Sequence, residues 1–152
     1  MIRYFLLFFP LLSLLLNLFF QRFVGSPEAV WSISWISALD LNLSFNFNPL
    51  GNLFSLVIAF IGFWVYFYAI QYLKKYKNTA RFWFFLTAFM FSMLGVVFAD
   101  NLIALFVFWE FTSICSYFLI GFYHEKESSR DSALMALLIT GLGGILLLGG
   151  FI

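Results

Sequence analysis

Long apolar runs alternate with short polar segments along the whole chain. Apolar runs of helical length occupy residues 2–20, 50–73, 82–99, 102–123 and 133–152, and a helix needs about 20 residues to cross a bilayer. We therefore predict an all-α integral membrane fold with five transmembrane helices. A first helix covers residues 1–20, an external loop covers 21–49, and a transmembrane bundle made of the last four runs covers 50–152.

The first run also has some features of a signal peptide, because Arg3 precedes the apolar stretch. However, the run is long for such a peptide and contains Pro10, and Gln21-Arg22-Phe23 follows it in place of a small-residue cleavage site. We therefore expect a retained transmembrane helix.

The long connection between the first two helices has a different period. From residue 40 to residue 48, apolar residues at positions 41, 43, 45 and 47 alternate with polar ones. Residues 31–35 (WSISW) alternate in the same way. Because a period of two is typical of half-buried strands, we predict a short external β-hairpin with its apolar side on the membrane surface.

The composition supports lipid as the solvent of this chain. Hydrophobic residues make up 64% of it and charged residues 10%, against roughly a quarter charged in soluble proteins; the mean hydropathy is +1.01. A net charge of +1 without a basic stripe excludes a nucleic-acid binder that works by bulk electrostatics. The single cysteine, Cys115, excludes a disulfide framework and a thiolate metal site. We predict no metal and no cofactor.

The basic residues predict the orientation. With a cytoplasmic N-terminus, seven of the eight Lys and Arg residues lie on the inner side, and only Arg22 lies outside. The loop 74–81 contributes most of this asymmetry. The positive-inside rule therefore predicts a multi-pass protein of the cell membrane whose N-terminus is cytoplasmic.

Glu110 is the only acidic residue near the middle of a predicted span. A charged carboxylate at that depth costs about 2.5–3.5 kcal/mol on insertion scales, so such residues usually carry function or pair with another group. We expect a proton-transfer or ion-binding group; the alternative is a structural acid bonded to a neighbouring helix. Since no Lys, Arg or His lies inside a span, we expect its basic partner to come from outside these 152 residues.

Polar residues near Glu110 outline a possible path for protons. Ser113 and Tyr117 lie on its helix face at i+3 and i+7, and Ser116 lies close by. His124 begins the polar loop at the cytoplasmic rim, where it is either a solvated residue or a proton entry or exit group.

Small residues in the last run predict close helix packing. Ala136, Thr140 and Gly144 are spaced by four and therefore share one face. The other glycines of this run also favour packing over phosphate binding, because no soluble strand precedes them.

These residues resemble a known family. The run LGVVFADNLIALFVFWE (94–110), followed by FTSICSYFLIGFYH (111–124), is similar to the core of antiporter-like membrane subunits. That family includes the large subunits of Mrp-type sodium/proton antiporters and the proton-pumping subunits of respiratory complex I. The segment LITGLGG (138–144) is more similar to MrpA, since complex I relatives tend to carry arginine where Gly141 stands.

The resemblance implies that Glu110, after Trp109, is the family's essential glutamate, which pairs in relatives with a lysine on a later broken helix. It also implies other antiporter subunits as partners and protons and Na⁺ as transported ions. Three features depart from the family pattern. Relatives usually have one more span before the hairpin, and the later spans with the broken helices and the lysine are absent from these 152 residues. Asn48 also stands where many relatives have aspartate.

Two functional hypotheses follow. In the first, the chain is the N-terminal part of a cation/proton antiporter protein, which is a secondary transporter and not an enzyme, and Glu110 carries protons. A proton-pumping membrane protein of complex I type is its near neighbour. In the second, the chain is a truncated assembly module that inserts into the membrane and transports nothing.

Overall fold

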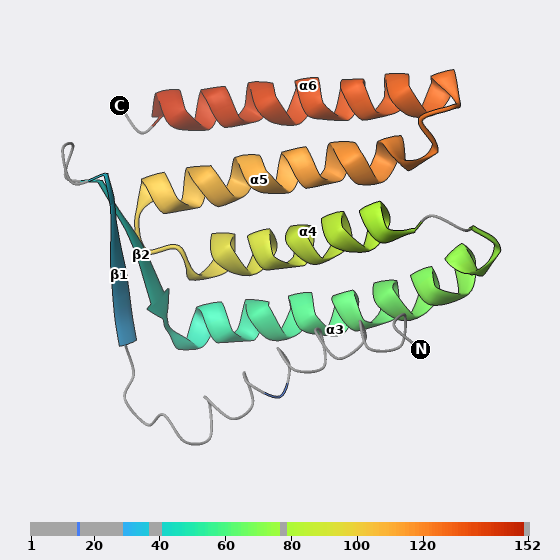
Figure 1. Ribbon diagram of the computed structural model, residues 1–152. Helices are drawn as coiled ribbons and strands as arrows, with labels where there is room; N and C mark the ends of the chain where they lie inside the picture. Colours follow the sequence, from blue (N-terminus) through green and yellow to red (C-terminus); the bar gives the residue numbers. More distant parts are fainter. Residues whose placement is uncertain (1–14, 16–28, 37–40, 77–78, 151–152) are drawn as a thin grey trace.

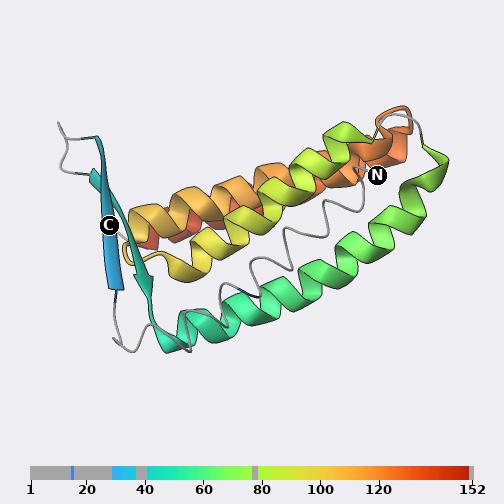
Figure 2. The ribbon, with the colours of Figure 1, turned by 60° about the horizontal axis from the view of Figure 1, so that its bottom comes forward.

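The computed structural model describes residue 15 and residues 29–36, 41–76 and 79–150. Apart from Leu15, the first predicted helix lies outside the described residues. Four long helices lie side by side in sequence order (Figure 1): α3 (Pro49–Tyr72), α4 (Ala80–Phe98), α5 (Leu102–Ile120) and α6 (Glu127–Gly150). The 3₁₀ turns η2 (Leu73–Lys75) and η3 (Gly121–Tyr123) extend α3 and α5. Seen from a second direction, α4, α5 and α6 are grouped closely, and α3 stands at the edge (Figure 2).

All four described helices are long and apolar enough to cross a membrane, which confirms the predicted fold class. The start of α6 differs from the expectation. The helix begins at Glu127, six residues before the apolar run and inside the segment expected to be a loop. Glu127 and Arg130 are good helix formers, and an acidic residue in the first turn interacts favourably with the helix dipole. The hydropathy pattern detects only the apolar part of a helix, so it missed the polar residues 127–132 at the start of α6.

Asparagine side chains fix the starts of two helices. The Asn48 side chain accepts a hydrogen bond of 2.6 Å from the backbone N–H of Gly51, with Pro49 in the first turn of α3. The Asn101 side chain accepts one of 2.7 Å from the backbone N–H of Ala104 at the start of α5. Each bond satisfies a backbone donor that has no partner within the helix.

The predicted hairpin is present. Strands β1 (Ala29–Ile36) and β2 (Leu41–Phe47) pair antiparallel, with Ile33 opposite Leu43. The hairpin covers one end of the helices (Figure 1). Part of its apolar side packs on those helix ends, because Phe45 contacts Phe108 at 5.6 Å between ring centroids and Phe47 contacts Phe98 at 4.7 Å.

Hydrogen bonds of the backbone and of side-chain amides join the hairpin to the turn between α4 and α5. The N–H of Asp100 donates to the carbonyl of Ser44 at 2.8 Å, and the side-chain amide of Asn101 donates to the carbonyl of Asn42. The Asn46 amide also donates to the Asp100 carboxylate at 3.2 Å.

Buried side chains hold α3, α4 and α5 together. A cluster between α3 and α4 includes Tyr66, Trp83 and Met90, and the Tyr66 hydroxyl lies 2.7 Å from Oγ1 of Thr87. Between α4 and α5, the Phe85 and Phe118 rings stack at 4.2 Å. The outward faces carry exposed apolar side chains, which suits contact with lipid.

Candidate functional site

Glu110 lies at the centre of α5, as the ninth of its 19 residues. Its side chain is half-buried, and its oxygen Oε1 is fully buried without a hydrogen-bond partner among the described residues. A buried acceptor without a partner is uncommon and costs free energy. Glu110 is therefore a polar group that the described packing leaves unsatisfied in the middle of a membrane span.

Gly144 of α6 forms the wall against which this carboxylate lies. A Cβ atom built on Gly144 would overlap Oε1 of Glu110 and would lie 2.9 Å from its Cδ. The carboxylate thus occupies the space that a side chain at position 144 would fill. Gly144 is buried, as this contact requires.

Three hydroxyl groups of α5 and α6 bond to the backbone of their own helices. Ser113 is buried, and its hydroxyl donates to the carbonyl of Trp109 at 3.4 Å. Thr112 donates to the same carbonyl at 2.6 Å. Thr140 donates to the carbonyl of Ala136 in its own helix at 2.8 Å. None of these bonds reaches the Glu110 carboxylate, although a rotation about χ1 could redirect a serine or threonine hydroxyl.

The remaining residues of the predicted path lie farther along α5. Ser116 and Tyr117 are half-buried, and the Tyr117 ring contacts Phe118 at 5.1 Å. His124 is exposed beyond η3, 14 residues after Glu110, which corresponds to about 21 Å along a helix. The described structure therefore places Glu110 in mid-span and His124 at the rim. The polar path between them stays a prediction.

One of the predicted packing residues, Gly144, meets α5 through its contact with Glu110. Gly144 is buried, and Ala136 and Thr140 are half-buried. One turn before Ala136, Ala133 is almost fully buried; a Cβ on Gly121 would lie 3.4 Å from the Ala133 methyl. The two helices approach closely at Gly144 and Gly121, where a side chain on the glycine would meet the other helix. Whether they govern subunit association stays a prediction.

Among residues 29–36, 41–76 and 79–150, no group of three or more His, Cys, Asp and Glu side chains could hold a metal ion. In the same residues, Lys and Arg occur at or beyond the helix ends and not at the depth of Glu110.

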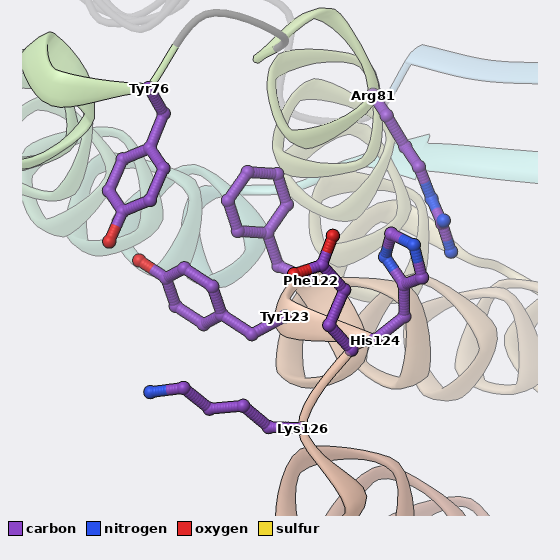
Figure 3. Close-up of a pocket in the computed structure, with 7 residues that line it drawn as sticks. Tyr76, Arg81, Phe122, Tyr123, His124 and Lys126 are labelled. Atoms are coloured by element: carbon purple, nitrogen blue, oxygen red, sulfur yellow. The ribbon is translucent and has the colours of Figure 1, made fainter.

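A second polar site was missed by the sequence reasoning. At the helix ends opposite the hairpin, a cavity of about 380 Å³ opens between the α3–α4 and α5–α6 connections (Figure 3). Its lining combines aromatic, basic and acidic side chains: Tyr76, Arg81, Phe122, Tyr123, His124, Glu125 and Lys126. Its sequence signal is the recurrence of tyrosines beside cations at the ends of two spans.

Two family descriptions match this chain. Residues 31–83 match the N-terminus of chain 5 of NADH-ubiquinone oxidoreductase (complex I). Residues 99–152 match the transmembrane region of NADH:quinone oxidoreductase/Mrp antiporter proteins.

Individual relatives agree with these matches. A protein provisionally named antiporter subunit mnhA2 is 48% identical over 122 residues in the JH9 and JH1 strains of Staphylococcus aureus, covering 80% of this chain. A chain in the structure of the Mrp complex from Dietzia sp. DQ12-45-1b superposes with a TM-score of 0.81 at 33% identity, covering 93% of this chain. This chain spans 15% of the length of each of these relatives.

Proposed function

Because this chain belongs to the antiporter-like family of membrane proteins and corresponds to the N-terminal part of an MrpA-type protein, we propose that it forms part of an antiporter, built from several subunits, that exchanges a monovalent cation, Na⁺, for protons. Glu110 is the proton-transfer group. The partners are the other subunits of the complex, and the surrounding bilayer is the solvent. The distribution of basic residues supports an N-terminus in the cytoplasm and a hairpin outside.

The placement of Glu110 carries the proposal. The carboxylate lies in the middle of α5, and its buried Oε1 has no hydrogen-bond partner among the described residues. A carboxylate in a low-dielectric site without a fixed partner responds strongly to any charge that approaches it. An acidic side chain at mid-span that the described packing leaves without a partner is the kind of group that proton relays through membranes use.

The experiment measures cation-dependent proton exchange in membrane vesicles that contain the complete complex. Glu110→Gln keeps the size of the side chain and removes the titrating group, so we expect exchange to fall to background while the complex still assembles. Glu127→Gln is the matched control, because Glu127 lies in the first turn of α6 at the helix end. We expect it to exchange normally. Normal exchange by an assembled Glu110→Gln complex would contradict the proposed role of Glu110 in proton transfer.

A proton-pumping role of complex I type is the second candidate, since both family descriptions include complex I. The identity to proteins named as parts of an antiporter favours the first. Dependence on a quinone-linked redox partner separates the two. Exchange driven by a cation gradient alone supports the antiporter, whereas proton movement only during quinone reduction supports the pump.

The orientation is tested with single cysteines in the two polar regions. A cysteine at Ser34 in the hairpin should react with a membrane-impermeant maleimide in intact cells, and one at Lys126 should react only after permeabilisation. The opposite pattern would invert the orientation.

A further inference from the structure

The cavity at the helix ends opposite the hairpin contains two cations held by aromatic rings. The Arg81 guanidinium carbon lies 5.2 Å from the centroid of the Phe118 ring, and the Lys126 ammonium lies 5.6 Å from that of Tyr123. Both side chains are exposed, and neither forms a salt bridge with a carboxylate of the described residues. Cation–π contacts hold such groups in place without neutralising their charge.

Tyrosines build the wall on the side of Lys126. The Tyr123 hydroxyl donates to the Tyr72 hydroxyl at 2.9 Å, and the rings of Tyr76 and Tyr123 lie 5.5 Å apart. Figure 3 shows the hydroxyls of Tyr76 and Tyr123 turned toward one another, with Arg81 beside His124 across the cavity. These contacts connect the end of α3 to the end of α5 and therefore hold the tyrosine rings of this wall in place.

The charge of the cavity favours an anion. Arg81 and Lys126 outnumber the single lining carboxylate, Glu125. Lys74 and Lys75 of η2 are exposed at the same end of the helices and add positive charge. His124 adds ring nitrogens that can donate hydrogen bonds.

The cavity lies at the level where a phospholipid carries its phosphate. It directly follows α5, whose 19 residues span about 28 Å, close to the roughly 30 Å of a bilayer hydrocarbon core. Tyrosines and basic side chains are enriched at this boundary. Phe84, three residues after Arg81 in α4, exposes 67% of its surface, which offers acyl chains an apolar contact.

We propose that this cavity binds the headgroup of an anionic phospholipid. Arg81 and His124, which lie side by side in Figure 3, contact its phosphate, Lys126 adds positive charge from the other side of the cavity, and the tyrosine wall packs against the glycerol region. Phosphate is the chemistry that these cations recognise. A lipid fits better than free phosphate, because the cavity is half aromatic and opens at the membrane boundary. Basic pockets between transmembrane helices bind such headgroups in general. The proposal does not depend on the transport mechanism.

The test measures lipid binding to the complete complex, purified in a neutral detergent. Phosphatidylglycerol, phosphatidylcholine or inorganic phosphate is added, and bound lipid is counted by native mass spectrometry. We expect phosphatidylglycerol to bind more tightly than phosphatidylcholine and inorganic phosphate not to displace it. Removing one cation near the membrane surface costs about 1 kcal/mol, so Arg81→Gln and Lys126→Gln should each weaken phosphatidylglycerol binding about fivefold.

Arg130→Gln is the matched control, because Arg130 is exposed at the same end of the structure but does not line the cavity. Arg81→Lys retains the charge and should lose less affinity than Arg81→Gln. If Arg81→Gln fails to assemble, Lys126→Gln carries the test alone, since Lys126 lies in an exposed turn. An equal loss with Arg130→Gln would overturn the site, as would unchanged binding in both cavity variants. Displacement by inorganic phosphate would overturn the lipid as the ligand.

Discussion

The carboxylate of Glu110 on α5 lies directly against the backbone of Gly144 on α6, in the space that a side chain at position 144 would occupy. This contact joins the one mid-span acid to the small-residue face of the next helix. It fixes where Oε1 points and keeps lipid away from that oxygen. The position of α6 therefore determines the surroundings of the proposed proton-transfer group.

Gly144→Ala should impair exchange without preventing assembly. The added methyl group overlaps Oε1, so the Glu110 side chain must change rotamer or α6 must shift. Misplacing a reacting group by about 1 Å can cost on the order of 100-fold in rate, and overpacking costs about 1–3 kcal/mol of stability. Cation-dependent proton exchange in vesicles measures the first effect, and thermal unfolding of the purified complex measures the second.

Gly143→Ala is the matched control on the same helix, because a Cβ there meets nothing within 4 Å. It should exchange normally and unfold at the same temperature or slightly higher, since alanine favours helix more than glycine does. Glu110→Asp on the Gly144→Ala background shortens the acid and should relieve the overlap. If Gly143→Ala and Gly144→Ala have the same exchange rate and the same unfolding temperature, the contact between Gly144 and Glu110 does not contribute to function.

Gly95→Ala should destabilise the α4–α5 contact more than Gly62→Ala destabilises the α3–α4 contact. A Cβ on Gly95 would fall on the ring of Phe108, within 2.6 Å of Cε1, whereas one on Gly62 would lie 3.0 Å from Sδ of Met90. A phenyl ring is rigid and packed against the hairpin through Phe45, but a methionine chain can change rotamer.

The expected cost of Gly95→Ala is about 1–3 kcal/mol, and the expected cost of Gly62→Ala is under about 1 kcal/mol. Thermal unfolding of the two purified variants in the same detergent provides the comparison. Equal melting temperatures would show that the Phe108 ring has room to move.

The sequence predicted the elements better than the contacts. Hydropathy located the four described spans, and the period of two located the hairpin, because both patterns follow from the solvent that each face meets. The cost of burying a charge singled out Glu110. Its contact with Gly144 depends on how α5 and α6 are rotated about their axes, and no one-dimensional pattern contains that rotation. The spacing of Ala136, Thr140 and Gly144 indicated only that one face of α6 carries small side chains.

The rim cavity was missed for a related reason. Its lining comes from the residue after η2, the start of α4, η3 and the turn that follows η3. Each of these segments alone is an ordinary polar end of a span. The site forms where segments far apart in the sequence meet, and beside it the hydroxyls of Tyr72 and Tyr123, which are 51 residues apart, share a hydrogen bond.

Asn101 should link the start of α5 to the hairpin through the two ends of one amide group. Its oxygen accepts from the N–H of Ala104, and its nitrogen donates to the carbonyl of Asn42. Asn101→Ala removes both bonds, and loss of the helix cap alone costs about 0.5–2 kcal/mol. Asn101→Asp keeps the cap and adds a favourable negative charge at the helix N-terminus, but it cannot donate to Asn42.

We therefore expect Asn101→Asp to retain the stability of the helices while it loosens the hairpin. Thermal unfolding of the purified complex should fall for Asn101→Ala and stay near the native value for Asn101→Asp. Limited proteolysis or hydrogen exchange of residues 41–47 should increase in both variants, since each loses the bond to the Asn42 carbonyl. Full protection of this strand in Asn101→Asp would mean that the bonds of Asp100 to Ser44 and Asn46 hold the hairpin in place by themselves.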